Sequence, residues 1–196
     1  MLEVEFCGAL TSLAGGLECL TSLQQFISLC KLFIYDYILE SISSSLEELS
    51  LLGCTSLYLM HLPIDGLQTL VSLDELRICY CPNLEAVPNL DNLTSLRELH
   101  IYSCGGLTSI PSGLASCTSL TNLSIDSCPN LVSIAEDVSR LQSLTLLSIF
   151  DYGKLQCLLT GPQRVQKIRL WGWPKLKSLP QQIQHFTSLT SFLLMD

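Results

Sequence analysis

The sequence predicts an α/β solenoid in which short parallel strands stack side by side, and three observations indicate it. A frame of the form LxxLxIxxCxxLxxI recurs along the chain, and recurrence at a period of roughly 20–50 residues is typical of repeat architectures. Hydrophobic residues make up 48% of the chain and charged residues only 14%, against roughly 25% charged in an ordinary domain. Within each frame, Leu-x-Ile alternates in the way that a short strand does.

The repeat is clearest in the middle of the chain, over residues 73–88, 96–111 and 120–134. These copies read LDELRICYCPNLEAVP, LRELHIYSCGGLTSIP and LTNLSIDSCPNLVSI. They begin 23 and then 24 residues apart. Each copy therefore predicts one strand at its Leu-x-Ile, followed by a turn and a return segment.

Weaker copies extend the pattern in both directions. Their strand residues are Leu2/Val4, Leu46/Leu49/Leu51, Leu144/Leu147/Ile149, Val165/Ile168/Leu170 and Leu189/Phe192/Leu194. We interpret residues 1–196 as one domain of about eight to nine repeats. Because the chain starts and stops inside repeats, without the polar caps that solenoids usually carry, we expect a fragment of a larger protein.

One strand, near residues 23–39, has two possible registers. Leu29/Leu32/Ile34 fits the frame best but makes uneven spacings of 30 and 17 residues. Leu23/Phe26/Ser28 keeps the spacing even but puts a serine where isoleucine belongs. We predict the first register, because it keeps an apolar residue at every buried position.

A single repeat is too thin to bury its own leucines, so neighbouring repeats must stack to build a continuous core. Short strands that stack in this way pair in parallel along one face. The expected shape is a curved horseshoe, with a parallel sheet on the concave face and with loops and short helices on the convex face.

Five of the ten cysteines fall at one position of the frame, three residues after its central apolar residue. They are Cys7, Cys54, Cys81, Cys104 and Cys128. Where the chain leaves a strand, a small buried donor can bond backbone carbonyls that would otherwise be unpaired. This is the asparagine-or-cysteine position of the leucine-rich-repeat consensus. We therefore predict structural thiols rather than disulfides or a metal site, and we expect no cofactor.

Composition and missing motifs exclude several classes of function. The net charge of −8 argues against nucleic acid, and no apolar run approaches the ~20 residues that span a bilayer. There is no GxxxxGK[ST], GxSxG or HExxH motif, so we expect no enzyme. Charge is uneven: residues 1–100 carry −10 and residues 101–196 carry +2. Reduced thiols and an acidic amino terminus indicate a cytoplasmic protein.

Residues on either side of the second buried apolar residue of each strand are expected to point outward on the concave face. Several are aromatic or arginine, the residue types that dominate interface hot spots. The alternative is that the rings pack on one another across strands and stabilise the sheet. The candidate protein-binding residues are Phe33, Tyr35, Arg77, His100, Tyr102, Asp126, Phe150, Arg169 and Trp171.

The repeats resemble those of plant intracellular immune receptors, the nucleotide-binding leucine-rich-repeat family. The resemblance rests on Cys-Pro-Asn-Leu at residues 81–84 and 128–131 and on Leu-Thr-Ser-Leu at 93–96, and it covers essentially the whole chain. It implies recognition of a pathogen effector or a host protein, and restraint of a nucleotide-binding domain in cis.

Two alternatives to an immune receptor stay open. One is an intracellular scaffold or adaptor for signalling or ubiquitin-ligase complexes. The other is an extracellular co-receptor, which would require glycan at Asn92 or Asn122.

Overall fold

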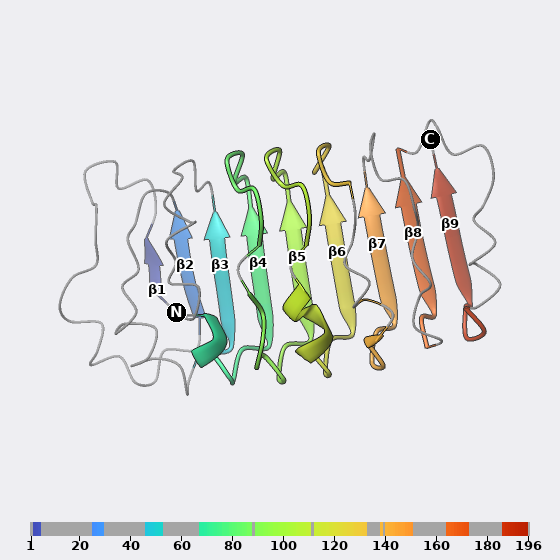
Figure 1. Ribbon diagram of the computed structural model, residues 1–196, viewed down its shortest axis with the longest axis horizontal. Coiled ribbons are helices and arrows are strands. Elements are labelled where there is room, and N and C mark those ends of the chain that lie inside the picture. Colours follow the sequence, from blue (N-terminus) through green and yellow to red (C-terminus); the bar gives the residue numbers. More distant parts are fainter. Residues whose placement is uncertain are drawn as a thin grey trace.

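Nine parallel strands form one sheet in strict chain order, β1 to β9, over the residues that the structure describes (Figure 1). The structure is a computed structural model. It describes residues 2–4, 25–29, 46–52, 67–87, 89–110, 112–132, 138, 140–150, 164–172 and 186–195. The strands are β1 (Leu2–Val4), β2 (Gln25–Leu29), β3 (Glu48–Leu52), β4 (Glu75–Cys79), β5 (Glu98–Tyr102), β6 (Asn122–Asp126), β7 (Leu146–Phe150), β8 (Lys167–Trp171) and β9 (Ser191–Met195). The predicted solenoid with a parallel sheet is confirmed.

The return segments contain two short 3₁₀ helices, η3 (Leu67–Thr69) and η4 (Ser112–Ser116). Both lie near the start of the strands that they accompany (Figure 1). A single bridge between Ala86 and Ser109 joins two return segments in parallel. Within the described part of the chain, no helix is long and apolar enough to cross a membrane.

The core is built from the alternate residues of each strand. In β4, Leu76 and Ile78 are fully buried, and the residues between and beside them are not. The same alternation holds in β3, β5, β6 and β8. The buried leucines of strands and return segments form one continuous cluster from Leu46 to Phe186. Stacked repeats thus share the core that no single repeat could build.

The second strand takes the register that we did not predict. Phe26 pairs with Leu49, and Ser28 lies between Val4 and Leu51 in the ladder. The prediction of Leu29/Leu32/Ile34 is therefore wrong. From Val4 to Ser28 is 24 residues and from Ser28 to Leu51 is 23, close to the central repeats. Each repeat needs a nearly constant number of residues to connect one strand to the next. This requirement for even spacing outweighs the cost of one serine at a position where the frame has isoleucine.

The prediction of buried structural cysteines is confirmed for the three of the five that lie in the described residues. Cys81, Cys104 and Cys128 form no disulfide and have no exposed surface. Cys104 Sγ lies 3.7 Å from the Ile78 carbonyl of the preceding repeat and 3.5 Å from that of Tyr102. Cys7 and Cys54 lie outside the described residues. The thiols act as small buried groups that bond backbone carbonyls where the chain leaves the strand.

A left-handed residue follows four of the strands and continues the ladder by one rung. Tyr80, Ser103, Ser127 and Gly172 have φ of 57°, 53°, 53° and 75°. Tyr80 N–H donates to the Tyr102 carbonyl at 2.8 Å, and Ser103 N–H donates to that of Asp126 at 2.9 Å. The sharp turn is therefore repeated at the same place in several repeats, and after β4, β5 and β6 the next residue is the buried cysteine.

Candidate functional site

The solvent face of the sheet carries three rows of side chains that run across the strands. Register pairing defines the rows from β3 to β9. The start row is Glu48, Glu75, Glu98, Asn122, Leu146, Lys167 and Ser191. The middle row is Ser50, Arg77, His100, Ser124, Ser148, Arg169 and Leu193. The end row is Leu52, Cys79, Tyr102, Asp126, Phe150, Trp171 and Met195.

Seven of the nine predicted binding residues lie on this face, spread over β4 to β8. They are Arg77, His100, Tyr102, Asp126, Phe150, Arg169 and Trp171. Phe33 and Tyr35 lie outside the described residues. They were assigned from the wrong register, because Gln25, Ile27 and Leu29 are the residues of β2 in register with Glu48, Ser50 and Leu52 of β3. The face positions near the second strand were therefore misplaced.

The aromatic side chains both pack on one another and remain accessible. Phe150 and Trp171 lie on neighbouring strands with ring centroids 6.3 Å apart. Trp171 is nevertheless 46% exposed and Tyr102 36% exposed. Packing of rings across neighbouring strands is thus observed for Phe150 and Trp171, and these rings still offer apolar surface.

Tyr80 is an aromatic residue of this region that sequence reasoning missed. Its ring meets that of Tyr102 edge-on, with centroids 5.0 Å apart and planes at 76°. Tyr80 is 57% exposed. It follows β4 in the left-handed conformation. The residue types of the frame do not predict a left-handed turn at a tyrosine.

Acidic side chains in the start row were also missed. Glu48, Glu75 and Glu98 are register neighbours on β3, β4 and β5. Like charges directly opposite one another destabilise a sheet. The signal was present in the sequence, because these residues lie two positions before the middle row and share its outward direction.

A polar network compensates two of these carboxylates. Arg77 forms an ion pair with Glu75 on the same strand. His100 Nε2 lies 3.0 Å from Glu98 Oε2 and 3.4 Å from Glu75 Oε1. Asn122 Nδ2 donates to Glu98 Oε1 at 3.1 Å. The acidic half of the face is therefore internally paired.

The same network contains the described residues that come closest to a metal-ligand set. Ligand atoms of Glu75, Glu98 and His100 all lie within 4.8 Å of one another. However, the Arg77 guanidinium already contacts Glu75 Oε1, and a cation in that place competes with a metal ion. The arrangement is best explained as an ion-pair network that neutralises neighbouring carboxylates.

Cysteine chemistry on this face is weak. Cys79 lies half-buried in the end row, beside Arg77 on the same strand. Burial raises the pKa of the Cys79 thiol, although the Arg77 charge opposes that effect. Because the thiolate is the nucleophilic form, Cys79 is poorly suited to covalent chemistry at neutral pH.

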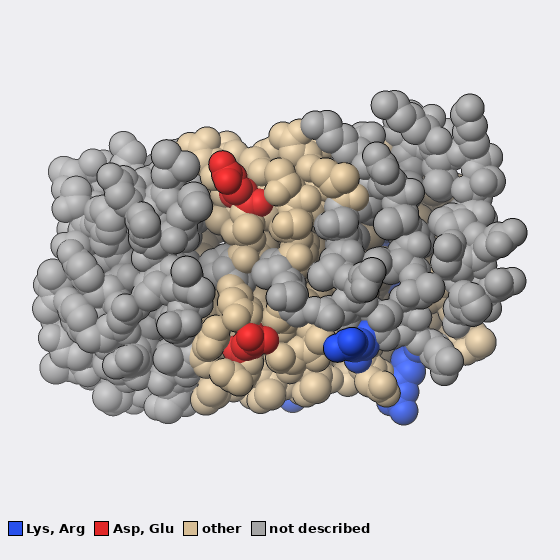
Figure 2. Space-filling model, viewed as in Figure 1, with Lys and Arg blue, Asp and Glu red and all other residues tan. Residues whose placement is uncertain are grey.

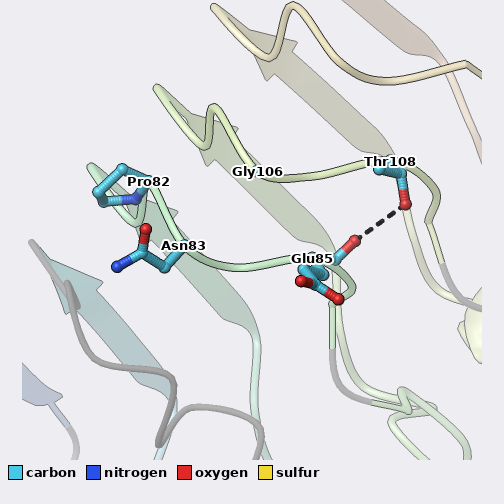
Figure 3. Close-up of a pocket in the computed structure, with 5 residues that line it drawn as sticks. All are labelled: Pro82, Asn83, Glu85, Gly106 and Thr108. Carbon is cyan, nitrogen blue, oxygen red and sulfur yellow. Dashed lines mark hydrogen bonds between the residues drawn. The ribbon is translucent and has the colours of Figure 1, made fainter.

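A depression of about 390 Å³ lies among the turns and return segments that follow β4 and β5 (Figure 3). It is lined by Pro82, Asn83, Glu85, Gly106 and Thr108. The Thr108 hydroxyl donates to the Glu85 carbonyl at 3.3 Å across it. On the face drawn in Figure 2, charged side chains of the described residues are few and isolated.

Comparison with solved structures identifies the fold as a leucine-rich-repeat solenoid. A leucine-rich-repeat protein of Leptospira interrogans matches with a TM-score of 0.54 at 19% identity, over 82% of this chain and 46% of its own. The leucine-rich-repeat domain of the type III effector XopL matches with 0.51 at 19%, over 95% and 73%. The plant peptide hormone receptor RGFR1, in complex with RGF2, gives 0.49 at 18%, over 90% and 32%.

The chain spans less than half the length of the Leptospira protein. No protein-family model and no curated protein matches the sequence. At these identities the structural comparisons establish the fold, and the function has to be argued from the face itself.

Proposed function

We propose that this chain is a protein-recognition module whose sheet face, on β4 to β8, binds a protein partner. The observation that carries the proposal is the exposure of Tyr102 and Trp171 beside Arg77 and Arg169 on one in-register sheet. Aromatic and arginine side chains supply most of the binding free energy at protein interfaces. An exposed row of them exceeds what a solvated sheet face needs.

The scaffold beneath the face supports this role because it holds the side chains in place. Strands β4 to β8 pair without interruption, and the residues that alternate with the face are buried leucine and isoleucine. Four interstrand steps of ~4.8 Å give a face roughly 19 Å wide. Side chains on rigid strands lose little conformational freedom on binding.

We further propose that the module is the pathogen-sensing and autoregulatory part of a plant intracellular immune receptor. Its partners would be a pathogen effector or a host protein, and a nucleotide-binding domain in cis. The support is the repeat sequence, with Cys-Pro-Asn-Leu at 81–84 and 128–131 and Leu-Thr-Ser-Leu at 93–96. Reduced, buried thiols at Cys81, Cys104 and Cys128 agree with the reducing cytoplasm.

The binding role is tested by alanine substitution and an affinity measurement on a partner captured with the chain. Tyr102→Ala and Trp171→Ala should each weaken binding at least tenfold. Val71→Ala and Val132→Ala are matched controls, because both valines are exposed, at 49% and 44%, but lie outside the strands. Equal binding by all four variants would contradict the proposal.

The receptor assignment is tested separately by the reading frame that encodes the chain. A P-loop motif upstream in the same frame is the expected result. An F-box in that position would instead identify an adaptor of a ubiquitin-ligase complex and overturn the receptor assignment, while leaving protein recognition intact.

A further inference from the structure

Strand β8 differs from the other strands in presenting cations and an aromatic ring in one column. Lys167, Arg169 and Trp171 are all exposed, and they alternate with the buried Ile168 and Leu170. Alternate residues of a strand lie ~6.6 Å apart on the same side. The side chains therefore start from three consecutive points on a straight line along the face.

The charges of this column are not neutralised within the described part of the chain. Neither Lys167 nor Arg169 forms an ion pair with a described residue. In β7 and β9, their register neighbours are Leu146 and Ser191 beside Lys167, and Ser148 and Leu193 beside Arg169. Those neighbours contain no carboxylate, so no described residue beside the column neutralises either cation.

The acidic half of the same face behaves differently. Glu75 is paired with Arg77, and Glu98 contacts both His100 and Asn122. A partner's cation would have to displace contacts that already exist. The carboxylates of Glu75 and Glu98 are therefore already paired, whereas the cations of β8 have no ion-pair partner among the described residues, although the chain as a whole carries −8.

Apolar surface borders the column on both sides. Trp171 contacts Phe150 of β7 with ring centroids 6.3 Å apart, and Leu193 of β9 is 41% exposed. Charge pairs that form beside apolar groups are strengthened when water leaves the contact. A guanidinium also binds a carboxylate through two parallel hydrogen bonds. The column thus suits a carboxylate that has an apolar side chain next to it.

We propose that the Lys167–Arg169–Trp171 column is a docking site for an acidic polypeptide segment, in which an aspartate or glutamate binds Arg169 and an adjacent apolar residue packs on Trp171. The inference rests on the proposed protein-binding function of this face and adds the chemistry of the partner. Nucleic acid and membrane surfaces fit less well. Polyphosphate partners recruit stripes of many cations, and anionic membranes recruit clusters of roughly four to eight.

The test is selection of a random heptapeptide library displayed on phage, carried out on the full chain. The chain, its Arg169→Glu variant and its Arg140→Glu variant are compared, since Arg140 is exposed but lies outside the strands. We expect enrichment of peptides that pair an acidic residue with an apolar one. A synthetic copy of such a peptide should bind Arg169→Glu at least tenfold more weakly and Arg140→Glu unchanged.

Several results would overturn the inference. These are no enrichment, enrichment of basic or neutral peptides, or acidic peptides that bind Arg169→Glu as well as the unaltered chain. Tighter binding of a twelve-residue oligothymidylate or of phosphatidylserine vesicles at physiological salt would also overturn it. Peptides that are lost with Trp171→Ala but kept with Arg169→Glu would reject the acidic partner while leaving the proposed binding face standing.

Discussion

Gly106 lies so close to Pro82 of the preceding repeat that a Cβ atom on it would sit 2.7 Å from the Pro82 carbonyl oxygen. The two residues occupy equivalent turns of adjacent repeats, and the absence of a side chain permits their close approach. The stacking distance between repeats is thus set partly by a glycine.

Gly106→Ala should destabilise the fold by about 1–3 kcal/mol, the usual cost of overpacking. Gly105→Ala is the matched control, since nothing lies within 4 Å of a Cβ atom at that position. It should stay within about 0.5 kcal/mol of the unaltered chain. Urea denaturation of both variants measures the difference, and equal midpoints would show that the repeats are not packed as closely here.

The left-handed turn after the strands predicts a pair of opposite effects. Ser103 has φ of 53° and Gly172 has φ of 75°, a region that disfavours residues with a Cβ atom by roughly 1–2 kcal/mol. Ser103→Gly should therefore raise the free energy of unfolding by up to about 1 kcal/mol, and Gly172→Ala should lower it. Thermal and urea unfolding check both. A loss of stability in Ser103→Gly would mean that the turn geometry is wrong.

Cys117 predicts a dependence of stability on alkaline pH. Burial, with a smaller contribution from the Asp91 charge, raises the pKa of this thiol from 9.0 to about 12. The thiolate therefore forms first in the unfolded chain. The contribution of the Cys117 thiol to the free energy of unfolding is fully present below pH 9 and is lost as the pH rises toward 12.

Above pH 9 the unaltered chain should lose up to about 1.4 kcal/mol per pH unit more than Cys117→Ala does. Urea denaturation at pH 8, 9.5 and 10.5 gives the two slopes. Parallel slopes would show that the Cys117 thiol is not buried as described.

The acidic start row predicts the effect of one added charge. Asn122 donates to Glu98 Oε1 at 3.1 Å, so Asn122→Asp would replace a donor with a like charge. We expect a loss of about 0.5–1 kcal/mol that becomes smaller in 1 M salt. Gln142→Glu, at an exposed position outside the strands, adds the same charge without that neighbour and should change stability little. Equal effects of the two variants would argue against a local interaction.

Sequence reasoning predicted the strands well where one apolar frame was dominant. From β3 to β8 the Leu-x-Ile positions are the buried positions of the register, because side chains alternate between the two faces of a strand and only one face is apolar. It failed near residue 28, where two apolar triplets competed and local hydrophobicity favoured the wrong one. The even path length of each repeat, a property of the whole stack, decided the register.

The positions of residues on the candidate face could be predicted, but the contacts between them could not. Arg77, His100 and Trp171 follow directly from strand alternation. The pairing of Glu98 with His100 and Asn122 does not, because it depends on which side chains meet across neighbouring strands. The contact of Tyr80 with Tyr102 depends on a left-handed turn at Tyr80, which no residue in the repeat signals.

The most direct test of the central claim is site-specific photo-crosslinking to the captured partner. A benzophenone amino acid is placed in turn at Tyr102, Trp171, Val71 and Val132 of the chain. If the sheet face is the binding surface, Tyr102 and Trp171 will give crosslinks and the two valine positions will not. Crosslinks confined to Val71 and Val132, with none at Tyr102 or Trp171, would place the partner away from the sheet and contradict the account.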